Sequence, residues 1–542
     1  MVWQTFLIFL VTLWGYSEWF FGTSYIQRPI MLGPLVGLVM GDLSAGIIMG
    51  ATMELAMAGA ISIGAYVPPD MVAGTVLGIS LAIKSNANAA AALTLGIPIA
   101  TLVLAMNTGI GQPLCLWFVH RCDRMAEQAN IKGFTINMLL ARYARMLPGL
   151  IFIPGAFYFG QDAVASFLES IPPFIKSGMD IAIGILPALG FAMLAQMIMN
   201  KKVVPFFFLG FFIVAYGHIS VTGVAIFATI LVSIMYVFFD KKVIPESETQ
   251  TSKVGSENTG GEGMGLMSFN FQPNYDKIIQ KSDLKKMFWY SIPYEHAWNF
   301  ERMGNVGFTF AMIPILKKLY PNKEDLSKAM KRHLEVYNMT PYIATLPLSI
   351  AAAMEEANVL EENFDTSSIA NVKVAMMGPL SGIGDAIFWG ALRIVATAIG
   401  TSLALQGNIL GPILFYLVFN VPHFLARYIL TFVGYGLGSN VISKLRASGI
   451  MDKIMNYASI LGMIVVGAMS MDMVKINFIT KVGLGKDAPT IQSLLDGVAP
   501  GLSVLLVFGI LYKLLQKKMN PLVIMLVILV ISILGAMIKV LG

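Results

Sequence analysis

The sequence predicts an all-α polytopic membrane protein, built as two helical membrane domains that contain broken or re-entrant helices. The 542-residue chain is 56% hydrophobic and only 13% charged, whereas a soluble domain carries about 25% charged residues. Its mean hydropathy is +0.72. Several of its apolar runs are shorter than the ~20 residues that a spanning helix needs. Short runs interrupted by Gly or Pro occur at membrane depth where protein or a water-filled cavity covers the backbone.

A polar gap divides the chain. Its centre reads "PESETQTSKVGSENTGGEGMG" and has no apolar periodicity, which is the composition of a flexible linker. We therefore predict a linker over residues 241–285. Residues 1–240 and 286–542 each contain several apolar segments, and each is predicted to be a membrane domain.

The predicted membrane segments follow from the apolar runs between polar or Gly/Pro-rich breaks. In the first domain they lie near residues 3–21, 30–50, 52–67, 71–83, 91–119, 147–160, 179–199, 203–217 and 220–239. In the second domain they lie near residues 305–316, 340–354, 371–405, 409–433, 455–471, 497–515 and 520–541. The paired glycines of "GLVMGDLSAGIIMG" predict close packing between two of the first helices.

Basic residues set the predicted orientation. They form three clusters separated from one another by about two spans. The clusters are Arg121, Arg124, Lys132, Arg142 and Arg145 in one loop, Lys201 and Lys202 in a second, and Lys241 and Lys242 in a third. Basic loops lie on the cytoplasmic side, so the linker is predicted to be cytoplasmic. The stretch "LKKLYPNKEDLSKAMKRHLEVYN" is predicted to be an amphipathic helix at that surface, with His333 exposed.

Four acids stand in or beside membrane-depth sequence: Asp42, Glu54, Asp70 and Asp385. An ionisable side chain is expensive there, so it normally faces a cavity, a partner or a substrate. The alternative is a paired or capping carboxylate that only orients helices. Asp42 follows a glycine and precedes an apolar run, so a helix cap is an equally good interpretation of it.

Other polar residues lie near two of these acids in the sequence. Gln27 and Arg28 precede a proline between two apolar runs, Ser62 lies between Glu54 and Asp70, and Asn86 and Asn88 stand at a break between segments. Carboxylates together with amides on irregular backbone suit a sugar, because hydroxyl groups need both donors and acceptors. The spacing does not exclude ion transport by the same acids.

The second half offers two further sites. In "GPLSGIGDAIFWGALR", Asp385 stands at a glycine-rich break between apolar runs, which indicates a substrate site. An ion pair between Asp385 and Arg393 is an equally good interpretation. In "HAWNFERMGNVGF", Asn299 is polar among aromatic residues, and the alternative there is an interfacial anchor.

Other classes of function find no support in the sequence. The five histidines have no metal-ligand spacing, no P-loop is present, and no arginine-rich aromatic segment predicts a nucleic-acid partner. Cys115 and Cys122 have neither redox nor zinc spacing. We therefore expect no catalytic residues, no metal and no cofactor in this chain.

Long motifs carry a family resemblance. "QRPIMLGPLVGLVMGDLSAGIIMGATMELAMAGAISIGAYVPPD" closely resembles the IIC membrane component of the mannose-family phosphotransferase system. "WNFERMGNVGFTFAMIPILKKLYP", "RHLEVYNMTP", "MGPLSGIGDAIFWG" and "GPILFYLVFN" closely resemble its IID component. The first match covers about residues 1–240 and the second about 280–542, so the chain resembles a fused IIC–IID protein.

The resemblance implies a sugar-translocating component of the bacterial cytoplasmic membrane. A separate IIB subunit, supplied with phosphate through IIA, would phosphorylate the sugar on its own phosphohistidine. Relatives form a trimer of IIC–IID pairs with an elevator-like moving domain, and some serve as bacteriocin receptors. Glu54, Asp70 and Asp385 match positions that keep an acid in the family motifs, whereas Gln27 and Ser62 match positions that vary. Relatives often have proline at the positions of Ala386 and Ile394, and this chain lacks both.

Two other functions remain open on the residues alone. An ion-coupled secondary sugar transporter would use the same acids and the two halves. A receptor for a peptide toxin or phage would use the outside loops, and would keep its binding after substitution of Glu54 and Asp70.

Overall fold

The computed structural model describes residues 1–58, 69–170, 172–240, 278–299, 301–438, 450–483, 489–519 and 521–542. Throughout these ranges the ordered elements are helices, and β pairing is confined to isolated bridges. The predicted all-α membrane fold is confirmed. Most of the predicted linker and Ser62 lie outside the described residues.

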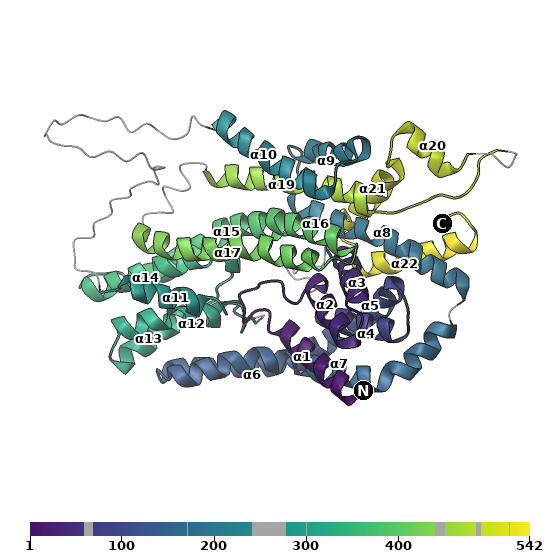
Figure 1. Cartoon of the computed structure of the whole chain (residues 1–542). Coiled ribbons are helices and arrows are strands. Elements are labelled where there is room, and N and C mark those ends of the chain that lie inside the picture. The colour runs from purple at the N-terminus through teal and green to yellow at the C-terminus, as the bar shows by residue number, and fades with distance from the viewer. Residues whose placement is uncertain are drawn as a thin grey trace.

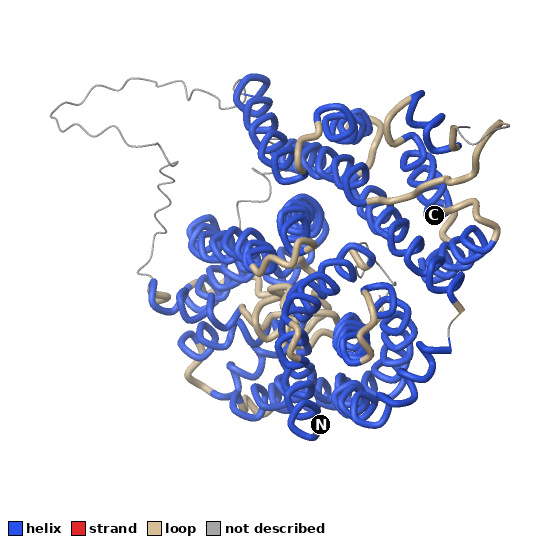
Figure 2. Tube along the Cα trace, turned by 45° about the vertical axis from the view of Figure 1, so that its right-hand side comes forward, coloured by secondary structure: helices blue, strands red, loops and turns tan. Residues whose placement is uncertain are grey.

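The described helices gather into two bodies, and each body takes helices from both halves of the chain (Figures 1 and 2). The first body holds α1 Val2–Tyr16, α2 Pro29–Met40, α3 Leu43–Ala56, α4 Met71–Lys84, α5 Ala89–Met106, α6 Gln112–Glu127 and α7 Ile131–Ser170. From the second half it adds α11 Lys281–Ser291, α12 Asn305–Leu319, α13 Lys323–His333, α14 Thr345–Leu360, α15 Ser367–Gly384, α16 Arg393–Ala404 and α17 Leu410–Leu437.

The second body interlocks the remaining helices of both halves. Helix α9 lies along α19, and α8 lies along α22 and α21. Its members are α8 Pro173–Ile198, α9 Val204–Gly217, α10 Val221–Asp240, α19 Ile450–Met473, α20 Ile491–Val498, α21 Leu502–Gln516 and α22 Pro521–Met537. Helices α3, α5 and α16 of the first body contact α8, α10 and α19 of the second.

Short helices in tight pairs line the middle of the first body. With 12 and 14 residues, α2 and α3 are about 18 and 21 Å long, too short for the ~30 Å hydrocarbon core. Their glycines allow backbone contact: a Cβ added to Gly37 would lie 2.8 Å from the Cα of Gly46. The predicted glycine packing is confirmed, except that Gly41 ends α2 in the left-handed region at φ 86°.

Six of the described helices are long and apolar enough to cross a membrane. A seventh span arises if α20 and α21, which meet at 90°, count as one broken helix. The structure therefore contains both kinds of element that the sequence predicts, full spans and broken ones.

Two π-helical turns interrupt the long helices. The turn η1 (Asn107–Gly111) lies between α5 and α6, and η4 (Asp385–Leu392) lies between α15 and α16. Each turn begins at a polar residue within an apolar span. Such turns leave backbone groups outside the regular ladder and occur often at functional sites.

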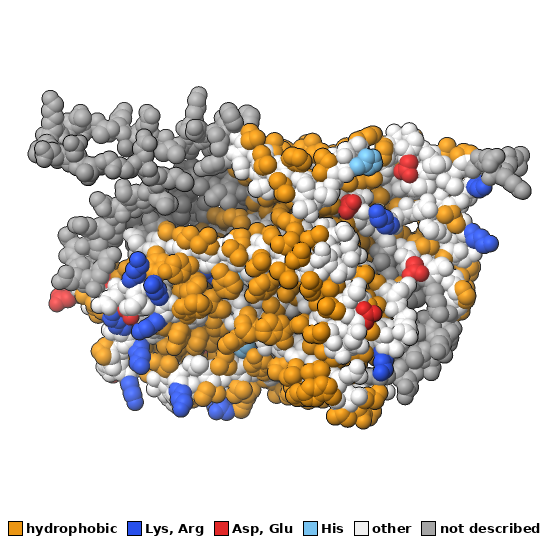
Figure 3. All heavy atoms as spheres, in the orientation of Figure 1, with side chains coloured by type: hydrophobic (Ala, Val, Ile, Leu, Met, Phe, Trp, Pro, Cys, Tyr) orange, Lys and Arg blue, Asp and Glu red, His pale blue; other side chains and the backbone are white. Residues whose placement is uncertain are grey.

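One end of the molecule is basic. The helix that runs from Ala89 to Glu127 has 39 residues, about 58 Å in length, so it extends well beyond a bilayer core. Lysine and arginine side chains gather at this end, over α13 and its neighbours, whereas a broad apolar surface covers the middle (Figure 3). A basic end of this kind is typical of the cytoplasmic side of a membrane protein.

Two predictions about basic residues are wrong. The five residues predicted to share one loop lie on helices, Arg121 and Arg124 on α6 and Lys132, Arg142 and Arg145 on α7, and Arg142 and Arg145 are buried. The guanidinium of Arg142 lies 3.7 Å from the ring centre of Trp19, and that cation–π contact lets a helix inside the protein hold the charge. His333 ends the predicted amphipathic helix, but its side chain is fully buried because it faces the core beneath α13.

Candidate functional site

Glu54 forms a buried ion pair with Arg28. Arg28 ends the connector that precedes α2, and Glu54 lies near the end of α3; both are at most 2% exposed. The Arg28 Nε donates to both carboxylate oxygens of Glu54, at 2.8 and 3.1 Å, and Nη2 donates to the same carboxylate. Nη2 also donates to the Met57 carbonyl at 3.2 Å. The geometry is bidentate and charge-assisted, the strong form of this interaction.

Asp70 is held by uncharged donors. Its carboxylate caps α4 by accepting from the Ala73 backbone at 2.9 Å. The Tyr16 hydroxyl donates to it at 3.0 Å and the Asn107 amide at 2.9 Å. Asn107 opens the π turn η1, and its carbonyl oxygen accepts from the Gly149 backbone at 3.1 Å. Asp70 therefore connects α1, α4 and η1.

Arg28 brings the two acid sites together. Its Nη1 lies 3.2 Å from the sulfur of Met71, the residue after Asp70. Beside them, an apolar pocket opens between the two bodies at the end of α3. Its lining includes Ala56, Met57, Pro69, Leu189, Met193 and Met525. The stretch with the two acids therefore borders both an ion pair and the boundary between the bodies.

The other polar residues predicted in the first half lie apart from this centre or serve the backbone. Gln27 is partly exposed, and its backbone donates to Glu18 at 3.1 Å. Asn88 caps α5 and donates to Asp180 at 2.9 Å. Asn86 is exposed and takes a left-handed conformation at φ 48°. Asp42 caps α3 through the Ala45 backbone and is exposed, so the capping interpretation is correct.

Asp385 does not form the ion pair that its spacing suggested. It accepts a 2.5 Å hydrogen bond from the Thr340 hydroxyl at the start of η4. Arg393 follows at the first position of α16, where its guanidinium lies 5.9 Å from the ring centre of Tyr25. The π turn η4 separates the two residues, and Arg393 Nη2 has no hydrogen-bond partner among the described residues.

Asn299 organises a turn in the second half. Its amide donates to the Met303 carbonyl and to the Asn305 side chain, both at 3.2 Å. Its carbonyl oxygen accepts from the backbones of Glu301 and Arg302, at 3.1 and 2.8 Å. The side chain is fully buried. This turn positions the charged groups on either side of it.

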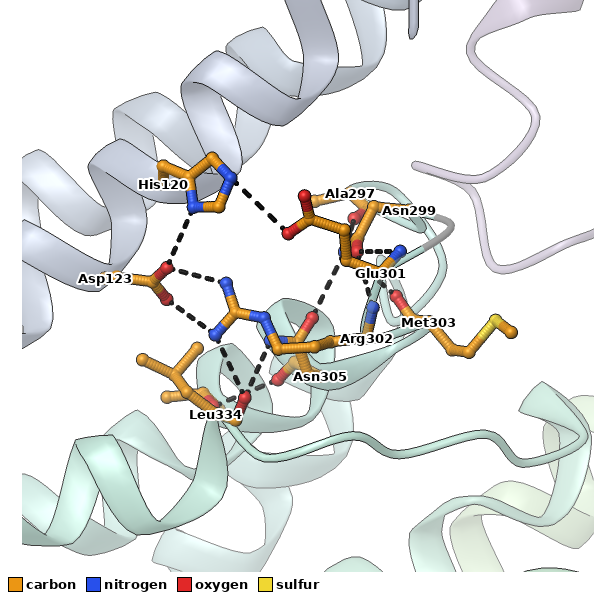
Figure 4. A network of polar contacts seen from close by, with 10 residues as sticks. His120, Asp123, Ala297, Asn299, Glu301, Arg302, Met303, Asn305 and Leu334 are labelled. Atoms are coloured by element: carbon orange, nitrogen blue, oxygen red, sulfur yellow. Dashed lines mark hydrogen bonds and ion pairs between the residues drawn. The ribbon is translucent and has the colours of Figure 1, made fainter. Parts of the chain in front are cut away.

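Those charged groups join the two halves at the basic end of the molecule (Figure 4). Arg302 donates to both carboxylate oxygens of Asp123 on α6, at 3.1 and 2.6 Å. His120 lies between Asp123 and Glu301, 3.6 and 3.4 Å from their oxygens. The prediction that Asn299 contacts substrate stays a prediction, and its observed hydrogen bonds support this polar joint.

The sequence did not predict a buried polar cluster around the carboxylate of Glu355. Arg332 and the Tyr320 hydroxyl donate to Glu355 on α14, and His333 Nε2 lies 2.9 Å from it. Burial lowers the pKa of His333 to about 4, so its ring is neutral at pH 7. Burial opposes ionisation of Glu355, but contacts with His333 and Arg332 outweigh it and lower its pKa. This cluster joins α12, α13 and α14.

The two side chains that donate to Asp70 were also missed. Tyr16 and Asn107 come from apolar stretches in which a single polar group is easily overlooked. Asn107, within "LAMNTGIGQ", offered the clearest signal, because an amide inside a membrane span needs a partner. No cluster suited to a metal ion is present among the described residues.

Comparison with known proteins explains both halves. Residues 278–541 match the family described as PTS system mannose/fructose/sorbose family IID component. Residues 2–234 match the family described as PTS system sorbose-specific IIC component.

Individual relatives agree with these matches. The mannose-specific EIID component of Escherichia coli is 38% identical over 271 residues, which are 49% of this chain and 95% of the relative. The fructose permease IIC component of Bacillus subtilis is 31% identical over 197 residues, 36% of this chain and 73% of the relative. A cryo-EM structure of the mannose transporter ManYZ with microcin E492 is 37% identical over 49% of this chain and 100% of its own, with a TM-score of 0.30. The chain belongs to the mannose/fructose/sorbose family of phosphotransferase-system sugar permeases, and it carries the IIC and IID components in one polypeptide.

Proposed function

We propose that this chain moves a hexose or a related sugar inward for phosphorylation by a separate cytoplasmic IIB subunit. The chain would supply the path and the binding groups, and the phosphohistidine would belong to IIB. IIB would receive its phosphate through IIA. The domains would be an IIC unit over residues 1–240 and an IID unit over 286–542, joined by a cytoplasmic linker.

One observation carries this proposal. The Arg28–Glu54 pair and the Asp70 network both lie at the ends of short helices in the first body, and α3, which carries Glu54, contacts α16 of the IID half. Charged and amide groups held on helix ends can meet sugar hydroxyls with both donors and acceptors. We propose Glu54, Asp70 and Arg28 as substrate contacts, and Ser62, Gln27 and Asp385 as further candidate contacts.

The basic end of the molecule suits the docking of IIB. Exposed lysines crowd α13, where Lys323, Lys328 and Lys331 lie within one helix. The polar joint of Asp123 and Arg302 holds both halves at this same end. A partner that approaches here would contact IIC and IID together.

The division into two bodies supports an elevator-type motion. An apolar pocket between α3 and α8 lies on the boundary across which one body would slide. Membrane-buried acids belong to the first body, so we propose that the first body carries the sugar. The family resemblance extends the proposal to a homotrimer and to reception of bacteriocins.

An ion-coupled secondary sugar transporter is the second candidate. It is favoured by Asp70, a partly exposed carboxylate whose hydrogen-bond donors in the described structure are all uncharged. Such a group is free to take up a proton. Glu54 fits the first candidate better, because Arg28 already balances its charge.

Reconstitution of the purified chain in liposomes separates the two candidates. Labelled mannose should accumulate as its phosphate ester only when IIA, IIB, the general phosphotransferase proteins and phosphoenolpyruvate are present. Omission of IIB alone should abolish accumulation, and an imposed proton or sodium gradient should not restore it. Accumulation of free sugar that follows an ion gradient would overturn the proposal in favour of the second candidate.

A further inference from the structure

We infer that the IID half contributes directly to sugar binding through Arg393, which acts with Tyr25 of the IIC half beside the Arg28–Glu54 pair. We call these four residues the seam site. The inference rests on the proposed function and deepens it, because it names the groups that bind the sugar hydroxyls where the IIC and IID halves meet.

Arg393 is a buried cation with an unsatisfied donor. Only 2% of it is exposed, and its Nη2 has no hydrogen-bond partner in the described part of the chain. Asp385, the acid nearest in sequence, bonds Thr340 instead. A buried charge without a partner is costly, so an arrangement of this kind indicates a group that a ligand completes.

Tyr25 presents a second unsatisfied group at the same place. Its side chain is 3% exposed and its hydroxyl lacks a partner among the described residues. Glu18 fixes the connector around it by accepting from the Tyr25 backbone at 2.8 Å. The Tyr25 ring lies 5.7 Å from Trp389 and 4.2 Å from Phe419, both from the IID half. Aromatic rings of both halves therefore surround the hydroxyl.

The seam site adjoins the first acid centre. Helix α16, which Arg393 opens, contacts α2 and α3, and Arg28 and Glu54 lie within electrostatic reach of Arg393. The charges of Arg28 and Glu54 balance each other, so the guanidinium of Arg393 is left to hold a ligand.

The chemistry fits a polyhydroxylated ring. A guanidinium is a rigid planar fork of donors, and two adjacent hydroxyl oxygens of a sugar match two of its N–H groups. The Tyr25 hydroxyl can donate to or accept from a third. Glu54 accepts, so the site offers both polarities. The rings of Tyr25 and Trp389 supply an apolar surface for the C–H face of the sugar.

Equilibrium binding to the purified full-length chain in detergent tests this assignment. The probes are labelled mannose, fructose and sorbose, followed by the single-deoxy analogues of the sugar that binds best. The variants are Arg393→Gln, Arg393→Lys and Tyr25→Phe. The matched control is Arg121→Gln, an exposed arginine on α6 that lies over Trp117. Gel filtration and thermal unfolding report whether each variant folds.

We expect Arg393→Gln to weaken binding about 10- to 100-fold, which is the range for a hydrogen bond from a charged donor. Arg393→Lys should recover part of the loss, because it keeps the charge but not the fork. Tyr25→Phe should weaken binding about three- to tenfold. Arg121→Gln should bind as the unchanged chain does.

The deoxy analogues separate contact from indirect damage. The unchanged chain should discriminate against loss of the hydroxyls that Arg393 binds, and Arg393→Gln should lose that discrimination at those positions while keeping it elsewhere. If Arg393→Gln does not fold, Tyr25→Phe and Arg393→Lys give the same comparison. Unaltered affinity and unaltered discrimination in the folded variants would overturn the seam site while the proposed function stands. Failure of the unchanged chain to bind any of the three sugars would count against the proposed function as well.

Discussion

Glu54 and Asp70 lie at the two ends of one short stretch, yet the protein satisfies them in opposite ways. Glu54 is fully buried and its partner Arg28 carries a full positive charge. Asp70 is partly exposed and takes its hydrogen bonds from a backbone amide, a phenol and a side-chain amide. The first acid belongs to a balanced pair, and the second belongs to a network of neutral groups.

This difference predicts how each acid should respond to the loss of its charge. Removal of one partner from a buried pair leaves the other charge buried and uncompensated, which costs ~3–5 kcal/mol. Removal of a charge that only neutral donors serve leaves those donors able to bond an uncharged oxygen. Substitutions that keep the shape and remove the charge therefore test whether the two acids differ in this way.

The largest effect is expected for Glu54→Gln. The substitution leaves the Arg28 guanidinium buried without its carboxylate, so unfolding should become easier by ~3–5 kcal/mol and uptake should be lost. Thermal unfolding in detergent and labelled-sugar uptake in liposomes measure the two consequences. Membrane insertion should survive, since most of the span-forming sequence is untouched.

A double variant separates stability from function at this position. Arg28→Met combined with Glu54→Leu replaces the pair by apolar groups, which in other proteins is neutral or stabilising. Stability should return while uptake stays absent. Normal uptake by Glu54→Gln or by the double variant would show that the ion pair only stabilises the fold and is not part of the sugar site.

An intermediate effect is expected at Asp70, and it should depend on the replacement. Asp70→Asn can keep the oxygen that caps α4, but its amide nitrogen then replaces the oxygen that accepts from Tyr16 and Asn107, so its cost in unfolding free energy should be ~1–2 kcal/mol. Asp70→Ala removes the cap and leaves Tyr16 and Asn107 without their acceptor, which should cost ~2–4 kcal/mol. The same unfolding assay measures both.

Uptake then tells whether the charge of Asp70 matters beyond its hydrogen bonds. We expect Asp70→Asn to stay folded, at a smaller cost than Asp70→Ala, and yet to lose uptake, because a sugar hydroxyl that donates to the carboxylate would lose a charged acceptor. Uptake at the normal rate by Asp70→Asn would restrict this residue to capping.

The membrane class and the acid positions could be predicted from the sequence because both are local signals. Low charge and long apolar runs need no knowledge of tertiary contacts, and a lone acid in an apolar run stands out by its cost. The partners of Glu54 and Asp70 are another matter. Asn107 lies 37 residues from Asp70, and only the packing of α5 against α4 and of η1 against α7 makes them neighbours.

The interlocking of the two halves was also beyond the reach of the sequence. Helices α9 and α19 lie side by side although more than 200 residues separate them, and an apolar helix face does not specify which other apolar face it meets. The same reason explains why Arg142 and Arg145 were wrongly predicted to lie in a loop and His333 to be exposed. Rules based on charge assume that solvent surrounds a basic residue. In the structure, Arg142 packs on the ring of Trp19 and His333 lies beside the carboxylate of Glu355.

The smallest effect is expected at Asp42, the acid that lies close to the same stretch without joining either centre. Asp42→Ala removes one capping bond to the Ala45 backbone at the exposed start of α3, which should lower the free energy of unfolding by ~1 kcal/mol. Uptake should be unchanged, because the side chain is exposed and its described hydrogen bond is to its own helix.

Asp42→Asn is the matched variant, since asparagine caps a helix as well as aspartate does. It should be indistinguishable from the unchanged chain in both unfolding and uptake. A loss of uptake in Asp42→Ala, with the unfolding cost still near ~1 kcal/mol, would mean that the start of α3 takes part in translocation. The functional site would then include the whole α2–α3 hairpin, and Asp42 would belong to it together with Glu54 and Asp70.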